Sequence, residues 1–201
     1  HGGQDFAQRQ HGLDAFTDRL VKATEALQVG HALTEGTQIG PVVSAVQLAA
    51  NLGWIDRGRA EGAELLTGGQ QLDRPTDGYF MAPAVFARTR NDMALNQTEM
   101  FAPITCIQPA ASYAEALALA NDSPFGLTAG IMTRSLARAA HFRANMRAGC
   151  VMVNLPTAGT DYHVPFGGRG QSSFGPREQG RYAAEFFTTV KTSYIAAGVP
   201  E

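Results

Sequence analysis

Apolar residues near the start of the chain recur at alternating spacings of three and four, which predicts a helix over residues 12–28. Asp18 and Lys22 fall on the opposite, solvent-facing side. A second helix is predicted to begin at Ser44, because Ser44 and Gln47 have the spacing of a capping box, and to end near Gly58 or Gly62. The apolar positions are Leu13, Phe16, Leu20, Ala23 and Leu27 in the first helix, and Leu48, Leu52 and Ile55 in the second.

Short apolar segments alternate with helical patterns through the middle of the chain. Strands that are apolar along most of their length, with helices between them, are typical of a parallel sheet covered on both faces. The predicted fold class is therefore α/β, with a parallel sheet in a three-layer domain. Strands are predicted over residues 64–67, 104–108, 128–133 and 150–154, helices over 112–120 and 136–147, and a loop over 70–77.

The last part of the chain has a different pattern. Residues 177–185 have a helical pattern, and residues 186–195 alternate in a way that predicts a two-faced strand. Such a strand suits pairing at a sheet edge, and another subunit could provide that edge.

Composition limits the class of protein. The chain has 201 residues, 44% hydrophobic, and a net charge of −2, which fits one domain with its own core. Charges of both signs are interleaved, so we expect no nucleic-acid partner, and no apolar run is long enough for a membrane span. The first residues are polar and carry no secretory signal, and there are two cysteines. These features favour a reducing cytoplasm.

Two segments could carry chemistry. Glu99 lies two residues before Phe101, after a polar turn and just before a predicted strand. A carboxylate there could bind ribose hydroxyls and the phenyl ring could face a nicotinamide, whereas the alternative is a surface Glu and a core Phe. Residues 154–180 form a long loop rich in Gly, Pro and Thr, with Tyr162 and Phe166 as candidates to line a pocket. The alternative is a structural cover loop.

Other chemistry finds less support. Cys106 and Cys150 lie in predicted strands, where a buried thiol is inert, so both are expected to be core residues. The five histidines are scattered, no cluster has zinc-like spacing, and no metal site is predicted.

Several segments in colinear order resemble the aldehyde dehydrogenase superfamily from about Leu13 to Ile195. Each segment alone is a weak signal, but together and in order they are specific. The segments are residues 39–42 (IGPV), 98–103 (TEMFAP), 121–130 (NDSPFGLTAG), 148–154 (AGCVMVN) and 165–168 (PFGG).

The resemblance implies a role for each matching residue. Glu99 would hold the ribose on the nicotinamide side of NAD or NADP, and Phe101 would pack near the nicotinamide. The last strand would serve in assembly of a homo-oligomer, and a small aldehyde would be the substrate. The wall of the aldehyde pocket would include Asn154, Thr157, Gly159, Tyr162 and Phe166.

The largest departure from the family lies at the front of the chain. The family's nucleophilic cysteine belongs to a Gly-Gln-x-Cys motif, and residues 3–6 (GQDF) are only a faint echo with Phe6 at the cysteine position. We therefore predict no catalytic residue in this chain and no tight binding of the cofactor by it alone. The expected organisation is an unmatched segment over 1–11, a partial catalytic domain over 12–185, and an oligomerisation strand and tail over 186–201.

Residues 154–168 and 172–180 look most like the branch acting on α-ketoglutarate semialdehyde, although a succinate-semialdehyde preference would look similar. Two interpretations remain open. The chain is the C-terminal part of a working dehydrogenase, or it is a self-associating or subunit-binding module that kept the scaffold without catalysis.

Overall fold

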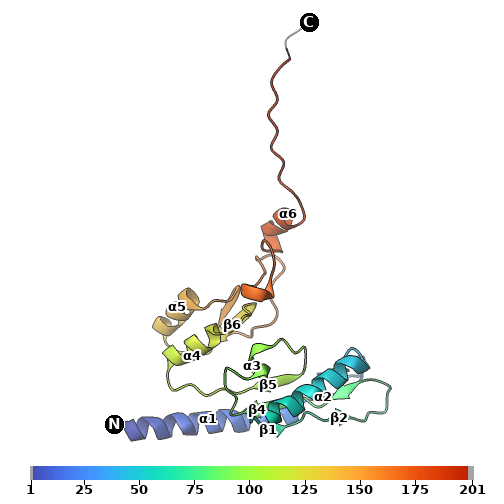
Figure 1. Ribbon diagram of the computed structural model, residues 1–201, viewed down its shortest axis with the longest axis vertical. Helices are drawn as coiled ribbons and strands as arrows, with labels where there is room; N and C mark the ends of the chain where they lie inside the picture. Colours follow the sequence, from blue (N-terminus) through green and yellow to red (C-terminus); the bar gives the residue numbers. More distant parts are fainter. Residues whose placement is uncertain (1, 199–201) are drawn as a thin grey trace. The chain divides into compact units, whose positions relative to one another are not determined.

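The computed structural model describes residues 2–198, with side chains from residue 12 onward. The chain divides into two compact units, residues 1–119 and 120–201, and each is described by itself. Both units combine helices with short strands (Figure 1). Within the described residues, no helix is long and apolar enough to cross a membrane.

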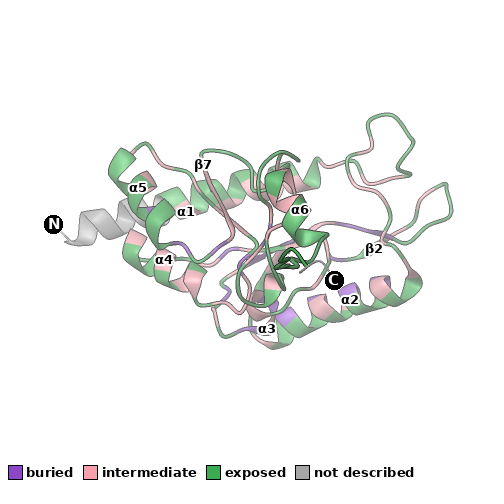
Figure 2. Ribbon diagram, turned by 90° about the horizontal axis from the view of Figure 1, so that it is seen from above, coloured by how far each residue is buried: buried purple, intermediate pink, exposed green. Residues whose placement is uncertain are grey.

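Unit 1 contains two long helices. Helix α1 covers Gly2–Glu25, so it begins ten residues before the predicted start at residue 12 and ends three residues before the predicted end. Helix α2 covers Ala45–Ala60, with Ser44 as its N-cap as predicted. The Ser44 hydroxyl accepts a hydrogen bond from the Gln47 amide at 3.2 Å. Figure 2 shows buried positions of α2 along one side and exposed positions along the other.

Unit 1 also contains a three-stranded sheet, in which the strands lie in the order β1-β4-β5. Strand β1 (Glu64–Thr67) matches its predicted bounds, and β5 (Ile104–Cys106) ends two residues earlier than predicted. Strand β4 (Ala84–Ala87) pairs antiparallel with β1 and parallel with β5, so this sheet is mixed rather than purely parallel. Two further strands, β2 (Gln71–Leu72) and β3 (Phe80–Met81), form a hairpin where a loop was predicted over 70–77.

The core of unit 1 forms between α2 and β4. Phe86 of β4 is completely buried, and Leu48 and Ile55 of α2 pack in the same cluster. Gly58 allows the close approach, because a Cβ there would lie 2.6 Å from Leu95 Cδ1 and 2.9 Å from Phe86 Cζ. Gly58 therefore lies within α2, where the absence of a side chain lets Leu95 and Phe86 pack against the helix, and the helix continues to Ala60.

Unit 2 contains a parallel pair of strands. Strands β6 (Thr128–Ile131) and β7 (Cys150–Val153) pair in parallel, which is the arrangement predicted, and α5 (Leu136–Asn145) connects them. Helix α4 (Tyr113–Asn121) leads from the first unit into the second.

The C-terminal part differs from the prediction. The helix expected over 177–185 is replaced by a short 3₁₀ turn, η2 (Gly180–Tyr182), and by α6 (Ala183–Phe186); η1 (Gly170–Ser172) precedes them. The strand expected over 186–195 is not formed within the single chain, because residues 188–198 have no strand to pair with and are exposed. Its predicted role in assembly stays a prediction.

Candidate functional site

A short loop over residues 98–102 carries the two candidate cofactor residues of unit 1. It follows directly after α3 (Ala94–Gln97), a single helical turn that the sequence analysis did not predict. The side chain of its N-cap, Met93, makes no capping hydrogen bond. Instead the Glu61 carboxylate, from the end of α2, accepts a hydrogen bond from the Ala94 amide at 2.8 Å. The start of this loop is thereby fixed to α2.

Met100 anchors the centre of the loop. Its side chain packs against the apolar core of unit 1, and its carbonyl accepts a hydrogen bond from Gln47 Nε2 at 3.2 Å. Gln47 therefore does not complete a reciprocal capping box with the Ser44 amide as predicted, because its side chain is directed to this loop instead.

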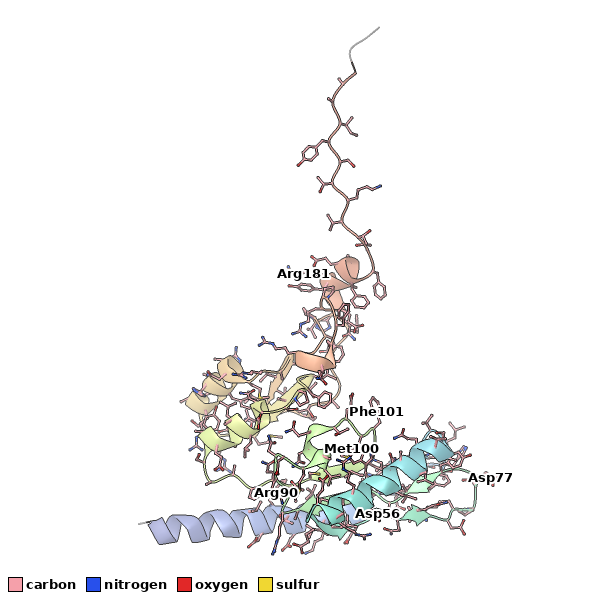
Figure 3. The ribbon with its side chains drawn as sticks, in the orientation of Figure 1. Asp56, Asp77, Arg90, Met100, Phe101 and Arg181 are labelled. Atoms are coloured by element: carbon pink, nitrogen blue, oxygen red, sulfur yellow. The ribbon has the colours of Figure 1, made fainter. Side chains whose placement is uncertain are left out.

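The residues on either side of Met100 face solvent. Phe101 is 80% exposed and has a φ of +51°, a left-handed conformation that is uncommon for a bulky residue. The Glu99 side chain is exposed as well. Among the described residues, no hydrogen bond or ion pair engages its carboxylate. Phe101 and Met100 project from the same loop in Figure 3. The loop thus presents a free carboxylate and a bare aromatic face two residues apart, which suits hydroxyl groups beside a planar ring.

The candidate pocket residues of unit 2 lie in one loop between β7 and η1. Thr157, Gly159 and Tyr162 are exposed, and Phe166 is half-buried. Asn154 has a φ of +56°, and both ends of its amide bond the Thr133 main chain: Oδ1 accepts at 2.8 Å and Nδ2 donates at 2.9 Å. Its side chain therefore fixes the start of the loop. Whether these residues wall an aldehyde pocket stays a prediction.

The other end of this loop is fixed by a second group of contacts. Phe166 and Glu178 exchange two main-chain hydrogen bonds at 2.8 and 3.0 Å. The guanidinium of Arg177 donates to the Gly168 carbonyl at 3.0 Å, and the Gly180 amide donates to the Tyr162 carbonyl at 3.0 Å. Residues 177–180 therefore hold the paired glycines in place, and the sequence pattern alone had not assigned them this role.

The paired glycines also lie directly against the start of β7. A Cβ at Gly149 would be 1.8 Å from the Gly167 carbonyl oxygen, so only glycine fits there. The Gly126 carbonyl accepts from both the Gly149 and Arg169 amides at 2.9 Å. This network gives a physical reason for the glycines of the residue segments 121–130, 148–154 and 165–168 to occur together.

Neither cysteine has the environment of a reactive nucleophile. Burial raises the pKa of the Cys106 thiol to about 11. Cys150 is half-buried, and its Sγ lies 3.9 Å from the Gly167 carbonyl. Within the residues that the structure covers, no three His, Cys, Asp or Glu side chains are grouped so as to hold a metal ion.

A hollow in unit 1 lies away from the loop over residues 98–102. It has a volume of about 430 Å³ between α1 and the β1–β4 edge, and the ion pair of Arg88 Nε with Glu64 Oε2 at 3.0 Å lies at its wall. None of the predicted site residues lines it. The candidate site of unit 1 is therefore an exposed loop and not a cavity.

Short strands, some of them paired in parallel, alternate with helices in both units, which is the arrangement of an α/β fold. The sequence profile of the family "Aldehyde dehydrogenase family" matches residues 6–193. The chain belongs to the aldehyde dehydrogenase family.

Individual relatives agree with this assignment. The chain is 38% identical over 189 residues to an alpha-ketoglutaric semialdehyde dehydrogenase from Bacillus subtilis (strain 168), a match that covers 92% of this chain and 39% of the relative. It is 38% identical over 202 residues to a betaine aldehyde dehydrogenase from Sinorhizobium fredii, covering 100% of this chain and 41% of that protein. The chain thus spans about two fifths of the length of these relatives.

Solved structures are similar in fold. An aldehyde dehydrogenase from Bacillus cereus superposes with a TM-score of 0.85 at 33% identity, over 90% of this chain and 36% of that one. A Mycobacterium tuberculosis aldehyde dehydrogenase complexed with NAD⁺ superposes with a TM-score of 0.82 at 32% identity, over 91% of this chain and 38% of that one. The predicted α/β fold of aldehyde dehydrogenase type is confirmed.

Proposed function

We propose that this chain forms the C-terminal part of the catalytic domain of an NAD(P)-dependent dehydrogenase that oxidises an aldehyde or semialdehyde to a carboxylate. The single observation that carries the cofactor part of this proposal is the free carboxylate of Glu99 beside the exposed ring of Phe101. Exposing a phenylalanine forgoes the free energy of burying its ring, so a binding partner for the ring accounts for the exposure.

The residues present fit one end of a dinucleotide. Glu99 would accept hydrogen bonds from the hydroxyls of the nicotinamide-side ribose, and Phe101 would lie against the nicotinamide. When bound, the cofactor accepts a hydride from the substrate. The relative from Mycobacterium tuberculosis was solved with NAD⁺, which supports the choice of a nicotinamide cofactor without deciding between NAD and NADP.

Nucleophilic attack on the aldehyde requires a group that this chain does not offer. A thiolate is the reactive form of cysteine, and the raised pKa of Cys106 keeps that thiol protonated at neutral pH. Cys150 is half-buried, and its thiol lies 3.9 Å from the Gly167 carbonyl oxygen, so it is not in an exposed nucleophile position. We therefore expect the chain to be inactive on its own.

For the substrate we propose α-ketoglutarate semialdehyde. A distal carboxylate needs hydrogen-bond donors, and the exposed loop offers the Thr157 hydroxyl, the Gly159 amide and the Tyr162 hydroxyl. The relative from Bacillus subtilis is named for this substrate. Succinate semialdehyde would use the same donors. A betaine aldehyde, for which another relative is named, carries a cation instead and would gain nothing from them.

The cofactor role can be tested on the chain itself. Nicotinamide mononucleotide, titrated at millimolar concentration and followed by NMR, should shift the ring resonances of Phe101. The main-chain amide resonances of residues 98–102 should shift in the same titration; Phe101→Leu should abolish that shift and Glu99→Gln should weaken it. Phe174→Leu, which alters another fully exposed phenylalanine, serves as the matched control and should leave the titration unchanged. No response in the unaltered chain would contradict the proposed cofactor site.

The lack of catalysis can be tested separately. Purified chain incubated with α-ketoglutarate semialdehyde and NAD⁺ or NADP⁺ should form no NADH or NADPH. Robust turnover that survives replacement of both Cys106 and Cys150 would contradict the proposal, because it would require a nucleophile that we have not identified.

A non-catalytic, self-associating module is the second candidate function. The C-terminal segment favours it, since Val190, Tyr194 and Ile195 are each more than 90% exposed. Three bare apolar side chains in one segment are suited to cover by another chain. Self-association and descent from a dehydrogenase are compatible, so only the activity assay above separates the two functions.

A further inference from the structure

We propose that Asn51 and Gln47 of α2 are positioning residues that hold Glu99 and Phe101 in place through the carbonyl of Met100. This inference rests on the proposed function, because it matters for catalysis only if the loop over 98–102 binds the cofactor.

Asn51 is a polar residue on the buried face of α2, where the helical spacing favours an apolar residue. It lies on the buried side of α2 between Leu48 and Ile55, and it is completely inaccessible to solvent. Its Oδ1 accepts a hydrogen bond from Gln47 Nε2 at 2.8 Å, whereas its Nδ2 is buried with no partner. A buried amide that is only half satisfied destabilises a core compared with a leucine of similar size. The packing of α2 therefore does not account for Asn51.

Its hydrogen bond with Gln47 does account for it. The Gln47 amide nitrogen has two hydrogens, and two acceptors lie within reach: Asn51 Oδ1 and the Met100 carbonyl at 3.2 Å. With one hydrogen directed to Asn51, the amide plane is fixed and the second hydrogen is directed to Met100. Without Asn51 the Gln47 side chain regains its rotamer freedom, and the hydrogen bond to the loop becomes one of several alternatives.

Met100 is the point at which this hydrogen bond acts on the loop. Its side chain packs against the core of unit 1. Its carbonyl oxygen is the main-chain atom through which Gln47 of α2 restrains the loop. Phe101 follows with a φ of +51°, which a bulky residue adopts only where its surroundings enforce it. Fixing the peptide between Met100 and Phe101 fixes the direction of the phenyl ring on one side and of the Glu99 carboxylate on the other.

Asn51→Leu tests this inference, because residue 51 is buried and cannot itself touch a cofactor. Conformational exchange of the loop over residues 99–102, measured by NMR relaxation dispersion, should increase in this variant, and the population of the released loop should rise about tenfold, the change expected when one hydrogen bond is lost. The midpoint of urea unfolding should stay the same or rise, since the unpaired amide is gone. Ala49→Leu, which places the same residue on the exposed side of α2, is the matched control and should leave exchange at residues 99–102 unchanged.

Two outcomes would overturn the inference. One is unchanged exchange at residues 99–102 in Asn51→Leu. The other is faster exchange throughout unit 1 with a lower unfolding midpoint, because that would make Asn51 a structural residue only. Should Asn51→Leu fail to fold, Gln47→Met removes the donor to the Met100 carbonyl itself, at similar size, and carries the same expectations for residues 99–102.

The nicotinamide mononucleotide titration separates this inference from the proposed function. With faster local exchange, Asn51→Leu should also weaken the response of Phe101 several-fold. If the unaltered chain shows no response at all, the proposed cofactor site fails. The exchange data then decide alone whether Asn51 and Gln47 order the loop.

Discussion

The Ala94 amide donates a hydrogen bond to the Glu61 carboxylate at 2.8 Å, although 33 residues separate them. The same carboxylate accepts from Arg57 Nε at 2.9 Å. Glu61 is therefore the C-cap residue of α2, and its side chain caps the first amide of α3, so it links the two helices. Its hydrogen bonds with Arg57 and then with the Ala94 amide lower the pKa of the Glu61 carboxyl.

Glu61→Gln should lower the unfolding midpoint at pH 7. A lowered pKa means that the ionised form stabilises the fold: the contribution is complete above the usual carboxyl pKa of 4.5 and is lost as pH falls through the lowered value. The difference between the two proteins should therefore shrink in acid. Urea unfolding at pH 7 and at successively lower pH measures it. Glu35→Gln, at an exposed position, is the control and should show no such pH dependence.

Helix starts were predictable from the sequence where a side chain bonds its own helix. Ser44 and Ser112 each accept from an amide three residues later, as their spacing predicts. Beside Ser112, the Glu115 carboxylate also accepts a hydrogen bond from the Ala111 amide at 2.6 Å. The cap of α3 was not predictable, because Glu61 reaches Ala94 only once the chain has folded.

Strand β4, which is buried along most of its length, was also missed. Residues 84–87 are only four, follow a proline, and are apolar on both faces, so they have no period that distinguishes them from a core loop. Their burial is set by α2 on one side and by pairing with β1 and β5. In unit 2 the sequence analysis did not predict that the glycines of three motifs lie in one network, and it gave Arg177 and Glu178 a helical pattern. Their contacts with Phe166 and Gly168 are long-range and leave no local signal.

Gly149→Ala should destabilise unit 2 by about 3 kcal/mol, because its Cβ would meet the Gly167 carbonyl oxygen at 1.8 Å and one strand end must move. Thermal unfolding followed by circular dichroism measures the loss. Gly53→Ala is the opposite case: this glycine lies within α2 with nothing within 4 Å of an added Cβ. It should stabilise the chain by about 0.5–1 kcal/mol. Equal effects of the two substitutions would contradict the close packing at Gly149.

Arg177→Met should loosen the C-terminal end of the loop between β7 and η1, which carries the candidate pocket residues. Loss of a charged hydrogen bond to the Gly168 carbonyl should raise the population of the open loop about tenfold. Cleavage by a protease within residues 155–164 should accelerate in proportion, as followed by mass spectrometry of the products. Arg143→Met, on the exposed face of α5, is the control and should leave the cleavage rate as it is.

Cys106 should resist alkylation at neutral pH. With a pKa of about 11 in place of 9, its thiolate fraction at pH 7.5 is about 100-fold lower than that of an ordinary thiol, and burial slows access further. Iodoacetamide labelling with peptide mass spectrometry should therefore modify Cys150 first. The folded state holds this proton more tightly than the unfolded state, so stability should fall as pH rises from 9 toward 11. Rapid labelling of Cys106 at pH 7.5 would contradict its burial.

Removal of residues 188–198 should change the free energy of unfolding by less than about 0.5 kcal/mol, because these exposed residues lie outside the core of unit 2. We expect the unaltered chain to associate and the shortened chain to associate less. Light scattering over a range of concentrations measures both. A monomer in both cases would contradict the predicted assembly role of this segment.

The loop between β7 and η1 is held at its two ends by separate sets of hydrogen bonds, and none of them involves the residues from Leu155 to Asp161. Asn154 secures one end to Thr133, and residues 177–180 secure the other. The intervening stretch from Leu155 to Asp161 can therefore be exchanged with that of a related enzyme as a cassette. Under the proposed function, such an exchange would alter substrate choice and leave the scaffold unchanged.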